Sequence, residues 1–142
     1  MSDEAAIRRL ITLYSQLLDD VRMDDWADLF TKDAVFSVWD NTFTGRDAIR
    51  DGIGGMQPAH PGKHVAFATV VDVDGDTALA WTDFISLADS GPGEWGRSYA
   101  IATAARYYDR LVRSDGRWRF ERRQIRMVGD PLPDGAAESP AV

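Results

Sequence analysis

Asp19 and His64 are the side chains whose types and positions best suit proton transfer. Asp19 lies at the end of an apolar helical seam, the kind of partly buried position where titratable groups take functional roles. The chain has two histidines. His64 opens a predicted strand, whereas His60 is flanked by loop residues. A lone histidine at a strand start is often only a surface or hydrogen-bonded residue, and most aspartates near a helical hairpin simply face water. Residue type alone therefore leaves a structural role open.

Other kinds of chemistry find less support in the sequence. The chain has no cysteine, so disulfides, thiolate metal sites and cysteine nucleophiles are excluded. Pro61-Gly62 separates His60 from His64 and would break the helix that could place both on one face for a metal ion. The GIGG run follows a helix instead of opening one, unlike a dinucleotide-binding fingerprint, and no nucleophile-elbow motif is present. We expect neither a metal nor a cofactor.

Two N-terminal helices would position Asp19. Apolar residues at three- and four-residue spacing predict a first helix with one buried face, capped by Ser2 or Asp3. Its apolar positions are Ile7, Leu10, Ile11, Tyr14, Leu17, Leu18 and Val21. A second, shorter helix carries Met23, Trp26, Ala27 and Phe30 on one face. Asp19 therefore falls where the two helices meet in a hairpin. A third short helix is expected from Arg46 to Ile53.

Strands account for most of the remaining chain and would position His64. A first strand is predicted from Ala34 to Val38. Four longer strands follow, at His64 to Val73, Thr77 to Leu87, Ser98 to Val112 and Arg117 to Val128. Asp74-Gly75 and Asp115-Gly116 suit tight hairpin turns, because glycine tolerates positive φ. The polar segment 88–96 is expected to be a longer loop between the middle strands.

Helices followed by a long antiparallel meander predict an α+β fold. We expect helices packed on a strongly curved antiparallel sheet, which would form a cone-shaped barrel with an internal cavity. Residues 1–129 would make up this single domain. Residues 130–142 are rich in proline, glycine and small side chains without periodicity, so we expect a flexible C-terminal tail.

Composition narrows the function classes. The chain has 142 residues, 44% of them hydrophobic, and a formal charge of −7. Such a charge argues against a general nucleic-acid binder, because phosphate neutralisation needs a basic face. No apolar run approaches the roughly 18 residues of a membrane span, and the N-terminus lacks the apolar core of a signal peptide. We therefore expect a cytoplasmic protein that binds a small hydrophobic substrate, with no nucleic-acid or membrane partner.

Motifs spread over nearly all of residues 7–128 carry a family resemblance. They are Tyr14, Leu18-Asp19, Trp26, Leu29-Phe30, Asp33-Ala34-Val35-Phe36, Gly45-Arg46-Asp47-Ala48-Ile49, His64, Val73-Asp74-Gly75-Asp76 and Asp115-Gly116-Arg117-Trp118. In this order they resemble the SnoaL-like family of the nuclear transport factor two-like superfamily. The resemblance implies the helix-covered cone. It is less specific for function, because the superfamily includes dehydratases, isomerases, polyketide cyclases, epoxide hydrolases and non-catalytic subunits.

The resemblance also implies site residues. Asp19 and His64 match the Asp and His pair of the dehydratase and dehydrochlorinase branch. Tyr14 matches a catalytic tyrosine of a bile acid dehydratase, and Arg123 matches a pocket arginine of a dehydrochlorinase. The asparagine often found four residues after the histidine is Ala68 here. Candidate apolar walls that would contact the substrate are Phe36, Trp81, Phe84, Tyr107, Ile125 and Met127.

Strand alternation gives expectations for the last strand. Arg123, Ile125 and Met127 share one face, which we expect to line the cavity. Trp118 and Phe120 would share the opposite face, unless a bulge lies between Phe120 and Arg123. Aromatic side chains on the outside of the sheet would favour a homodimer or higher homo-oligomer.

Together these residues suggest a cofactor-independent lyase that acts on a small, hydrophobic and cyclic substrate. Asp19 would fix the tautomer of His64 and favour its charged form. His64 would then remove a proton from carbon, while Tyr14 or the new imidazolium donates to the departing oxygen. Arg123 would bind a carbonyl or carboxylate. An isomerase or polyketide cyclase could use the same pair. A non-catalytic binding or accessory protein is a further alternative, and it predicts that Asp19 and His64 point apart.

Overall fold

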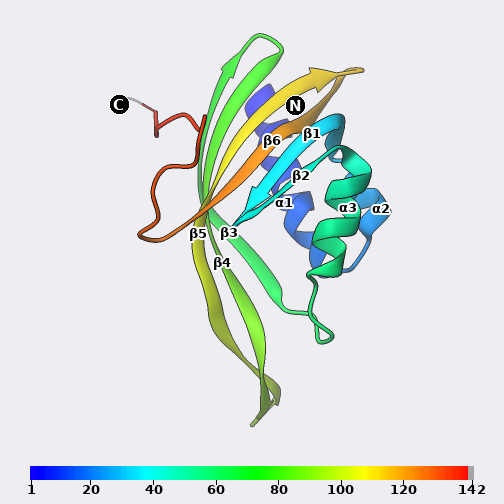
Figure 1. Ribbon diagram of the computed structural model, residues 1–142, viewed down its shortest axis with the longest axis vertical. Coiled ribbons are helices and arrows are strands. Elements are labelled where there is room, and N and C mark those ends of the chain that lie inside the picture. Colours follow the sequence, from blue (N-terminus) through cyan, green and yellow to red (C-terminus); the bar gives the residue numbers. More distant parts are fainter. Residues whose placement is uncertain (141–142) are drawn as a thin grey trace.

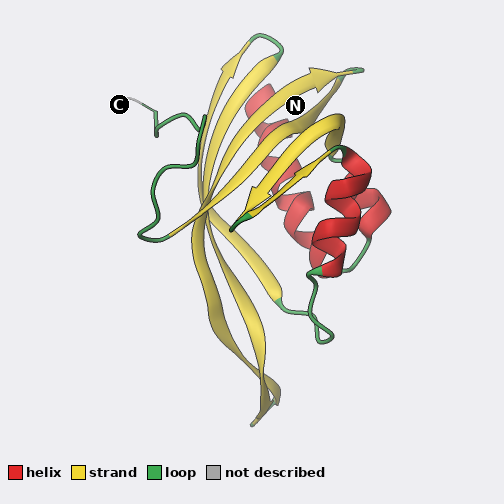
Figure 2. Ribbon diagram, in the orientation of Figure 1, coloured by secondary structure: helices red, strands yellow, loops and turns green. Residues whose placement is uncertain are grey.

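The computed structural model describes residues 1–140 and has an α+β architecture (Figures 1 and 2). The α+β fold class predicted from the sequence is therefore confirmed. The elements in chain order are α1 (Asp3–Asp19), α2 (Met23–Ala27), β1 (Phe30–Val38), β2 (Asn41–Thr44), α3 (Arg46–Gly55), β3 (Lys63–Asp74), β4 (Thr77–Gly93), β5 (Gly96–Ser114) and β6 (Arg117–Met127). None of the helices in this described part of the chain is long and apolar enough to span a membrane.

The strands form one curled sheet of order β2-β1-β6-β5-β4-β3, and the helices lie on one side of it (Figure 2). The pairs of β3 to β6 are antiparallel, as expected, but β1 pairs with β6 in parallel. β2 and β3 form the two edges and are not neighbours. The sheet is therefore a curved shell with α1 against its concave side, and not a closed barrel.

α1 forms where the apolar spacing predicts a helix. The Ser2 hydroxyl accepts a hydrogen bond from the Ala5 amide at 3.1 Å and so caps an otherwise unpaired donor of the first turn. The predicted seam is buried from Ile7 to Leu18. Val21, which the apolar spacing also places in the seam, lies beyond the helix and is 55% exposed. The helix ends before Val21, so the periodicity no longer applies to it.

The middle hairpin is longer than the sequence predicts. Residues 88–96 were expected to form a loop. Instead, β4 extends to Gly93, β5 begins at Gly96, and the two strands stay paired as one hairpin. Figure 1 shows this arm projecting beyond the rest of the sheet. Register shifts at Ser86/Leu87 and Asp89/Gly91 accommodate the irregular sequence. Glycine and proline are tolerated here because bulges absorb residues that a regular ladder would exclude.

A bulge in β6 overturns the face predicted for Trp118 and Phe120, whereas Arg123, Ile125 and Met127 share the concave face as expected. Leu111 pairs with Phe120 and Arg110 pairs with Arg122, so Glu121 is the extra residue. Phe120 and Arg123 consequently face the same concave side and are both fully buried. Trp118 is also buried, at 7% exposure, against the N-terminal end of α1, where its indole donates to Asp3. The outward aromatics on which the expected dimer rested are therefore core residues, and the dimer stays a prediction.

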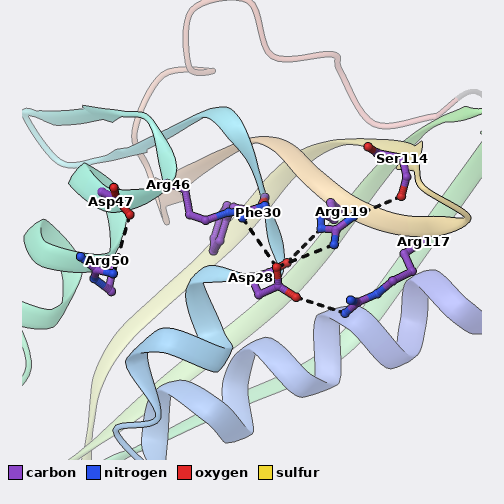
Figure 3. A network of polar contacts seen from close by, with 8 residues as sticks. All are labelled: Asp28, Phe30, Arg46, Asp47, Arg50, Ser114, Arg117 and Arg119. Atoms are coloured by element: carbon purple, nitrogen blue, oxygen red, sulfur yellow. Dashed lines mark hydrogen bonds and ion pairs between the residues drawn. The ribbon is translucent and has the colours of Figure 1, made fainter.

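The corner between α2 and β1 is fastened to the sheet by arginines around Asp28 (Figure 3). Arg119 donates to the Asp28 carbonyl at 3.1 Å and to the Ser114 carbonyl at 3.1 Å. Arg46, at the start of α3, donates to the Phe30 carbonyl at 2.9 Å. Backbone carbonyls that end an element are thereby paired. This network joins α2, α3, β1 and β6 where α2 leads into β1.

The C-terminal segment 130–140 has no helix or strand, and it lies along the convex side of the sheet (Figure 2). Side chains of the sheet donate to its backbone: Trp81 Nε1 to the Ala137 carbonyl at 3.1 Å, Gln124 Nε2 to Asp134 at 2.8 Å and Arg126 Nε to Asp130 at 2.7 Å. Trp81 is 5% exposed there. The tail thus covers apolar surface of the sheet in this structure. Its flexibility stays a prediction, and residues 141–142 of the predicted tail lie outside the described residues.

Candidate functional site

Asp19 and His64 are brought together at the end of α1. The His64 Nδ1 atom lies 2.6 Å from Asp19 Oδ1, and the His64 backbone amide donates to both carboxylate oxygens at 3.1 Å. Lys63 Nζ lies 3.5 Å from Asp19 Oδ2. The Asp19 side chain is 5% exposed and that of His64 is 24% exposed. The carboxylate is therefore fixed from several directions, while the imidazole keeps one accessible edge.

Local chain geometry sets this pairing. At the end of α1, Arg22 N bonds the Leu17 carbonyl at 2.9 Å and Val21 N bonds the Leu18 carbonyl at 3.0 Å. These two hydrogen bonds form a Schellman motif, which ends the helix just after Asp19. On the other side, Gly62 packs so closely on β4 that a Cβ there would lie 2.0 Å from the Leu87 carbonyl oxygen. That approach fixes the start of β3, and hence His64.

The pair faces a cavity of about 240 Å³ between the helices and the concave side of the sheet. With Nδ1 engaged by Asp19, Nε2 is the ring nitrogen left to exchange a proton. The predicted wall residues that line the cavity are Phe36, Phe84, Tyr107, Ile125 and Met127, and Tyr14 lines it too. Water-poor walls strengthen the electrostatic interactions between groups inside such a cavity.

Trp81 does not line this cavity, contrary to expectation. β4 alternates, so Ala80, Thr82 and Phe84 face the concave side while Trp81 faces the convex side. There its indole bonds the Ala137 carbonyl. A large aromatic residue suggested a cavity wall, but Trp81 is buried because the C-terminal segment covers it. The position of that segment could not be predicted from the sequence.

Arg123 is not in the cavity wall either. Its Nε and Nη2 atoms donate to the two carboxylate oxygens of Asp109 at 2.8 and 2.7 Å, and both side chains are fully buried. The guanidinium carbon lies 4.1 Å from the ring centre of Tyr14 and 3.8 Å from that of Tyr107. Arg123 therefore lies behind the two tyrosines, because Asp109 on the neighbouring strand binds its guanidinium and the bulge at Glu121 places Phe120 beside it.

The buried cluster of Tyr14, Tyr107 and Arg123 contains two polar atoms without a partner in the described part of the chain. Within residues 1–140, neither the Tyr107 hydroxyl nor Arg123 Nη1 has a hydrogen-bond partner. Burial raises the pKa of Tyr14 to about 12 and raises the pKa of Tyr107 well above its usual value, although Arg123 opposes both shifts. Burial likewise raises the pKa of Asp109, against the effect of Arg123. Both hydroxyls are thus protonated at neutral pH and can donate hydrogen bonds.

Sequence reasoning missed several residues of this site. Asp109 gave no signal, since its partner lies on another strand and only the register brings them together. Lys63 precedes His64 in the chain, and a lone lysine at a strand start gives no signal of a site. Three further residues line the cavity mouth, namely Val21, Trp39 and Met56. For Val21 and Trp39, the only sequence signal of a site is an unusual residue type in a turn. Within residues 1–140, no three His, Cys, Asp or Glu side chains are grouped so that they could hold a metal ion.

A curled sheet covered by helices, with a polar pair inside an apolar cavity, defines the class of nuclear transport factor two-like domains. The model of the SnoaL-like domain family matches residues 1–124. The chain therefore belongs to the SnoaL-like family, as its motifs indicated.

Solved structures agree with this assignment. Rv3472 of Mycobacterium tuberculosis, described as of unknown function, is 26% identical, with a TM-score of 0.79 over 96% of this chain and 77% of that one. An NTF2-like protein with a cystatin-like fold from Novosphingobium aromaticivorans is 26% identical, with a TM-score of 0.78 over 95% and 84%. The "Putative Scytalone Dehydratase" of the same species is 25% identical, with a TM-score of 0.73 over 96% and 95%. Curated proteins gave no significant match.

Proposed function

We propose that this protein is a cofactor-independent lyase that removes water from a small hydrophobic, cyclic substrate. The observation that carries the proposal is the 2.6 Å contact between His64 Nδ1 and Asp19, at the edge of an apolar cavity. The similarity to a protein named as a scytalone dehydratase supports a dehydration. The alternative of a non-catalytic accessory protein predicted that the two side chains point apart, and their contact does not favour it.

In this mechanism His64 Nε2 takes a proton from a carbon next to a carbonyl. The electron pair of that C–H bond forms a carbon–carbon double bond, and the C–O bond at the neighbouring carbon breaks. The departing hydroxyl leaves as water after it takes a proton from the Tyr14 hydroxyl or from the His64 imidazolium. Asp19 stabilises the imidazolium that forms. General acid and base groups of this kind contribute roughly 10²- to 10⁴-fold each.

Arg123 takes a different role from the one the resemblance implied. It is enclosed by Asp109 and the faces of Tyr14, Tyr107 and Phe120. From there it holds the tyrosine rings in place by cation–π contact. Tyr14 is the group that contacts the substrate oxygen, and Arg123 is a positioning residue behind it.

An isomerase or a cyclase would use the same pair and return the proton to another carbon, without loss of water. Product mass separates the two reactions. Purified protein is incubated with cyclic β-hydroxy ketones of one to four rings, and the products are weighed by mass spectrometry. Loss of one water from a member of the series supports the lyase, whereas rearrangement at constant mass supports the isomerase.

The matched variants are His64→Ala and His60→Ala. His60 lies in the neighbouring loop and is not part of the cavity lining, so its loss should leave turnover unchanged. We expect His64→Ala to lower turnover by at least about 100-fold with an unchanged melting temperature. Full turnover in His64→Ala would contradict the proposed mechanism.

A further inference from the structure

The mouth of the cavity carries exposed apolar side chains. Val21, Trp39 and Met56 line the cavity and are 55%, 63% and 38% exposed. We call these three residues the apolar rim. Single apolar side chains on a surface are ordinary. The other exposed residues of the lining are Pro58, Pro61, Ala102 and Lys63, so the exposed part of the cavity lining is mostly apolar, with Lys63 beside Asp19 as its charged member.

Val21 occupies a backbone position that normally takes glycine. It follows the C-cap of α1, at the position of the Schellman motif that adopts the left-handed conformation, and its φ is +56°. A β-branched residue is a genuine outlier at positive φ, because its side chain crowds the backbone. Glycine would end the helix with less strain, so the helix end does not explain a valine here.

Trp39 shows the same conflict in another element. It is the first residue of the two-residue turn between β1 and β2, since Val38 pairs with Asn41. Its φ is +50°, and such turns favour glycine, asparagine or aspartate at positive φ. A large, half-exposed indole is costly there both in backbone strain and in exposed apolar surface.

The third non-glycine residue with positive φ among residues 1–140 is Asp115. It lies in the Asp115-Gly116 turn between β5 and β6, outside the cavity lining, and aspartate is well suited to that conformation. Away from the cavity the chain thus uses a residue that fits the turn. At the mouth it uses valine and tryptophan instead, and strain of this kind tends to persist where it serves a site.

The size of the cavity points in the same direction. Its volume of about 240 Å³ lies below the roughly 300–1,000 Å³ of most small-molecule sites. A ligand whose volume exceeds about 240 Å³ must therefore extend through the mouth. There it meets Val21, Trp39 and Met56.

We infer that the apolar rim is a binding subsite for the outer, apolar part of an elongated substrate. The polar reacting end lies at His64 and Tyr14, and a hydrocarbon portion passes between Val21 and Trp39. This orientation rests on the proposed function, but binding at the rim does not require turnover. Val21 and Trp39 are specificity-determining residues that select ligands by the length of their apolar portion.

The test uses 4-alkylcyclohexanones with progressively longer alkyl chains as probes, with dissociation constants measured by calorimetry. In the wild type, affinity should rise about fourfold for each methylene group that reaches the rim. Trp39→Gly and Val21→Gly should bind the shortest ketone normally and lose this gain for the longer ones. Their melting temperatures should stay equal or rise, because glycine relieves the positive φ.

Three control variants separate loss of the rim from general effects of a substitution. Trp95→Gly removes another exposed tryptophan, which is 93% exposed at the tip of the β4–β5 arm, and should keep the full gain. Asp115→Gly should also keep it. His64→Ala should keep the gain although its turnover is lost, so failure of the lyase proposal and failure of the rim are distinguishable.

The inference is overturned if the wild type binds none of the ketones or binds all of them equally. It is also overturned if the rim variants keep the full gain for long chains. Finally, a wild-type dimer in sedimentation that Trp39→Gly converts to monomer would mean that a second copy covers the rim.

Discussion

At the scale of single residues, the buried pair of Asp109 and Arg123 shows how burial changes the worth of a charge. Removal of one partner leaves the other charge buried and unpaired, which costs about 3–5 kcal/mol. We expect Asp109→Ala to lower the free energy of unfolding by that amount in urea denaturation. A loss below about 1 kcal/mol would contradict the structural role of the pair.

The matched control is Glu121→Ala. Glu121 pairs with Arg110 at 2.5 Å, but its side chain is 43% exposed. Surface pairs of this kind contribute about 0–1 kcal/mol, so the free energy of unfolding should hardly change. The contrast between the two variants isolates burial, because both remove a carboxylate that faces an arginine on a neighbouring strand.

The buried tyrosines predict loss of stability at high pH. Their raised pKa values mean that the folded protein keeps the protons of Tyr14 and Tyr107 after the unfolded chain has released them. The stability they contribute is therefore complete below the ordinary tyrosine pKa of about 10 and is lost as pH rises toward the Tyr14 pKa of about 12. Urea unfolding at increasing pH should show this decline.

Tyr14→Phe should make that decline shallower, because phenylalanine has no proton to release. Tyr99→Phe is the control, since Tyr99 is 51% exposed and should leave the pH profile unchanged. An equally steep decline in Tyr14→Phe would mean that other groups unfold the protein at high pH.

Sequence separation did not decide which residues could be predicted, since Asp19 and His64 are 45 residues apart and Arg123 and Asp109 only 14. Asp19 and His64 could be paired because both match the Asp and His pair that the family resemblance implies, whereas residue type and periodicity alone left a structural role open. The surroundings of Arg123 could not be predicted, because they depend on a bulge at Glu121 and on Asp109 in another strand. Trp81 failed as a cavity residue for a related reason: its cover comes from the tail.

At the scale of elements, the start of β3 is the feature on which the site depends most. A side chain at position 62 would meet the Leu87 carbonyl oxygen at 2.0 Å. Gly62→Ala should therefore push β3 away from β4, which lowers the free energy of unfolding by about 1–3 kcal/mol and displaces His64. Urea denaturation and turnover measure the two effects.

Gly55→Ala is the matched control at the end of α3. A Cβ there would meet nothing within 4 Å, and alanine favours helix more than glycine does. This variant should be as stable as the wild type or slightly more so. Equal behaviour of the two variants would show that the close approach at Gly62 is not needed.

Periodicity located the elements well where patterns were long and failed where they were interrupted. The α1 seam and the long strands were evident because many residues repeat the same spacing. The arm at residues 88–96 was not, because glycine and proline predict a loop unless bulges keep the strands paired. The face predicted for Trp118 and Phe120 was wrong for a similar reason, since the extra residue Glu121 reverses the alternation before it.

At the scale of the whole molecule, the C-terminal segment packs on the sheet, although its sequence predicted no fixed contacts. Its composition predicted a flexible tail. In the structure it accepts hydrogen bonds from Trp81, Gln124 and Arg126. A chain that ends at Gly129 should therefore melt about 3–6 °C lower and show a red-shifted tryptophan emission as Trp81 becomes exposed. An unchanged melting temperature and emission would show that the segment is mobile in solution.

The central claim is that Asp19 and His64 act as one catalytic unit, and a double-mutant cycle of turnover tests it most directly. The substrate is the cyclic β-hydroxy ketone that loses water in the turnover experiment. With it, kcat/KM is measured for the wild type, Asp19→Asn, His64→Ala and the double variant. Residues that act as a unit are not additive. We predict that Asp19→Asn costs less than His64→Ala and that the double variant is no slower than His64→Ala alone, within about twofold. Losses that multiply in the double variant, or wild-type turnover in His64→Ala, would contradict a shared catalytic role for the pair.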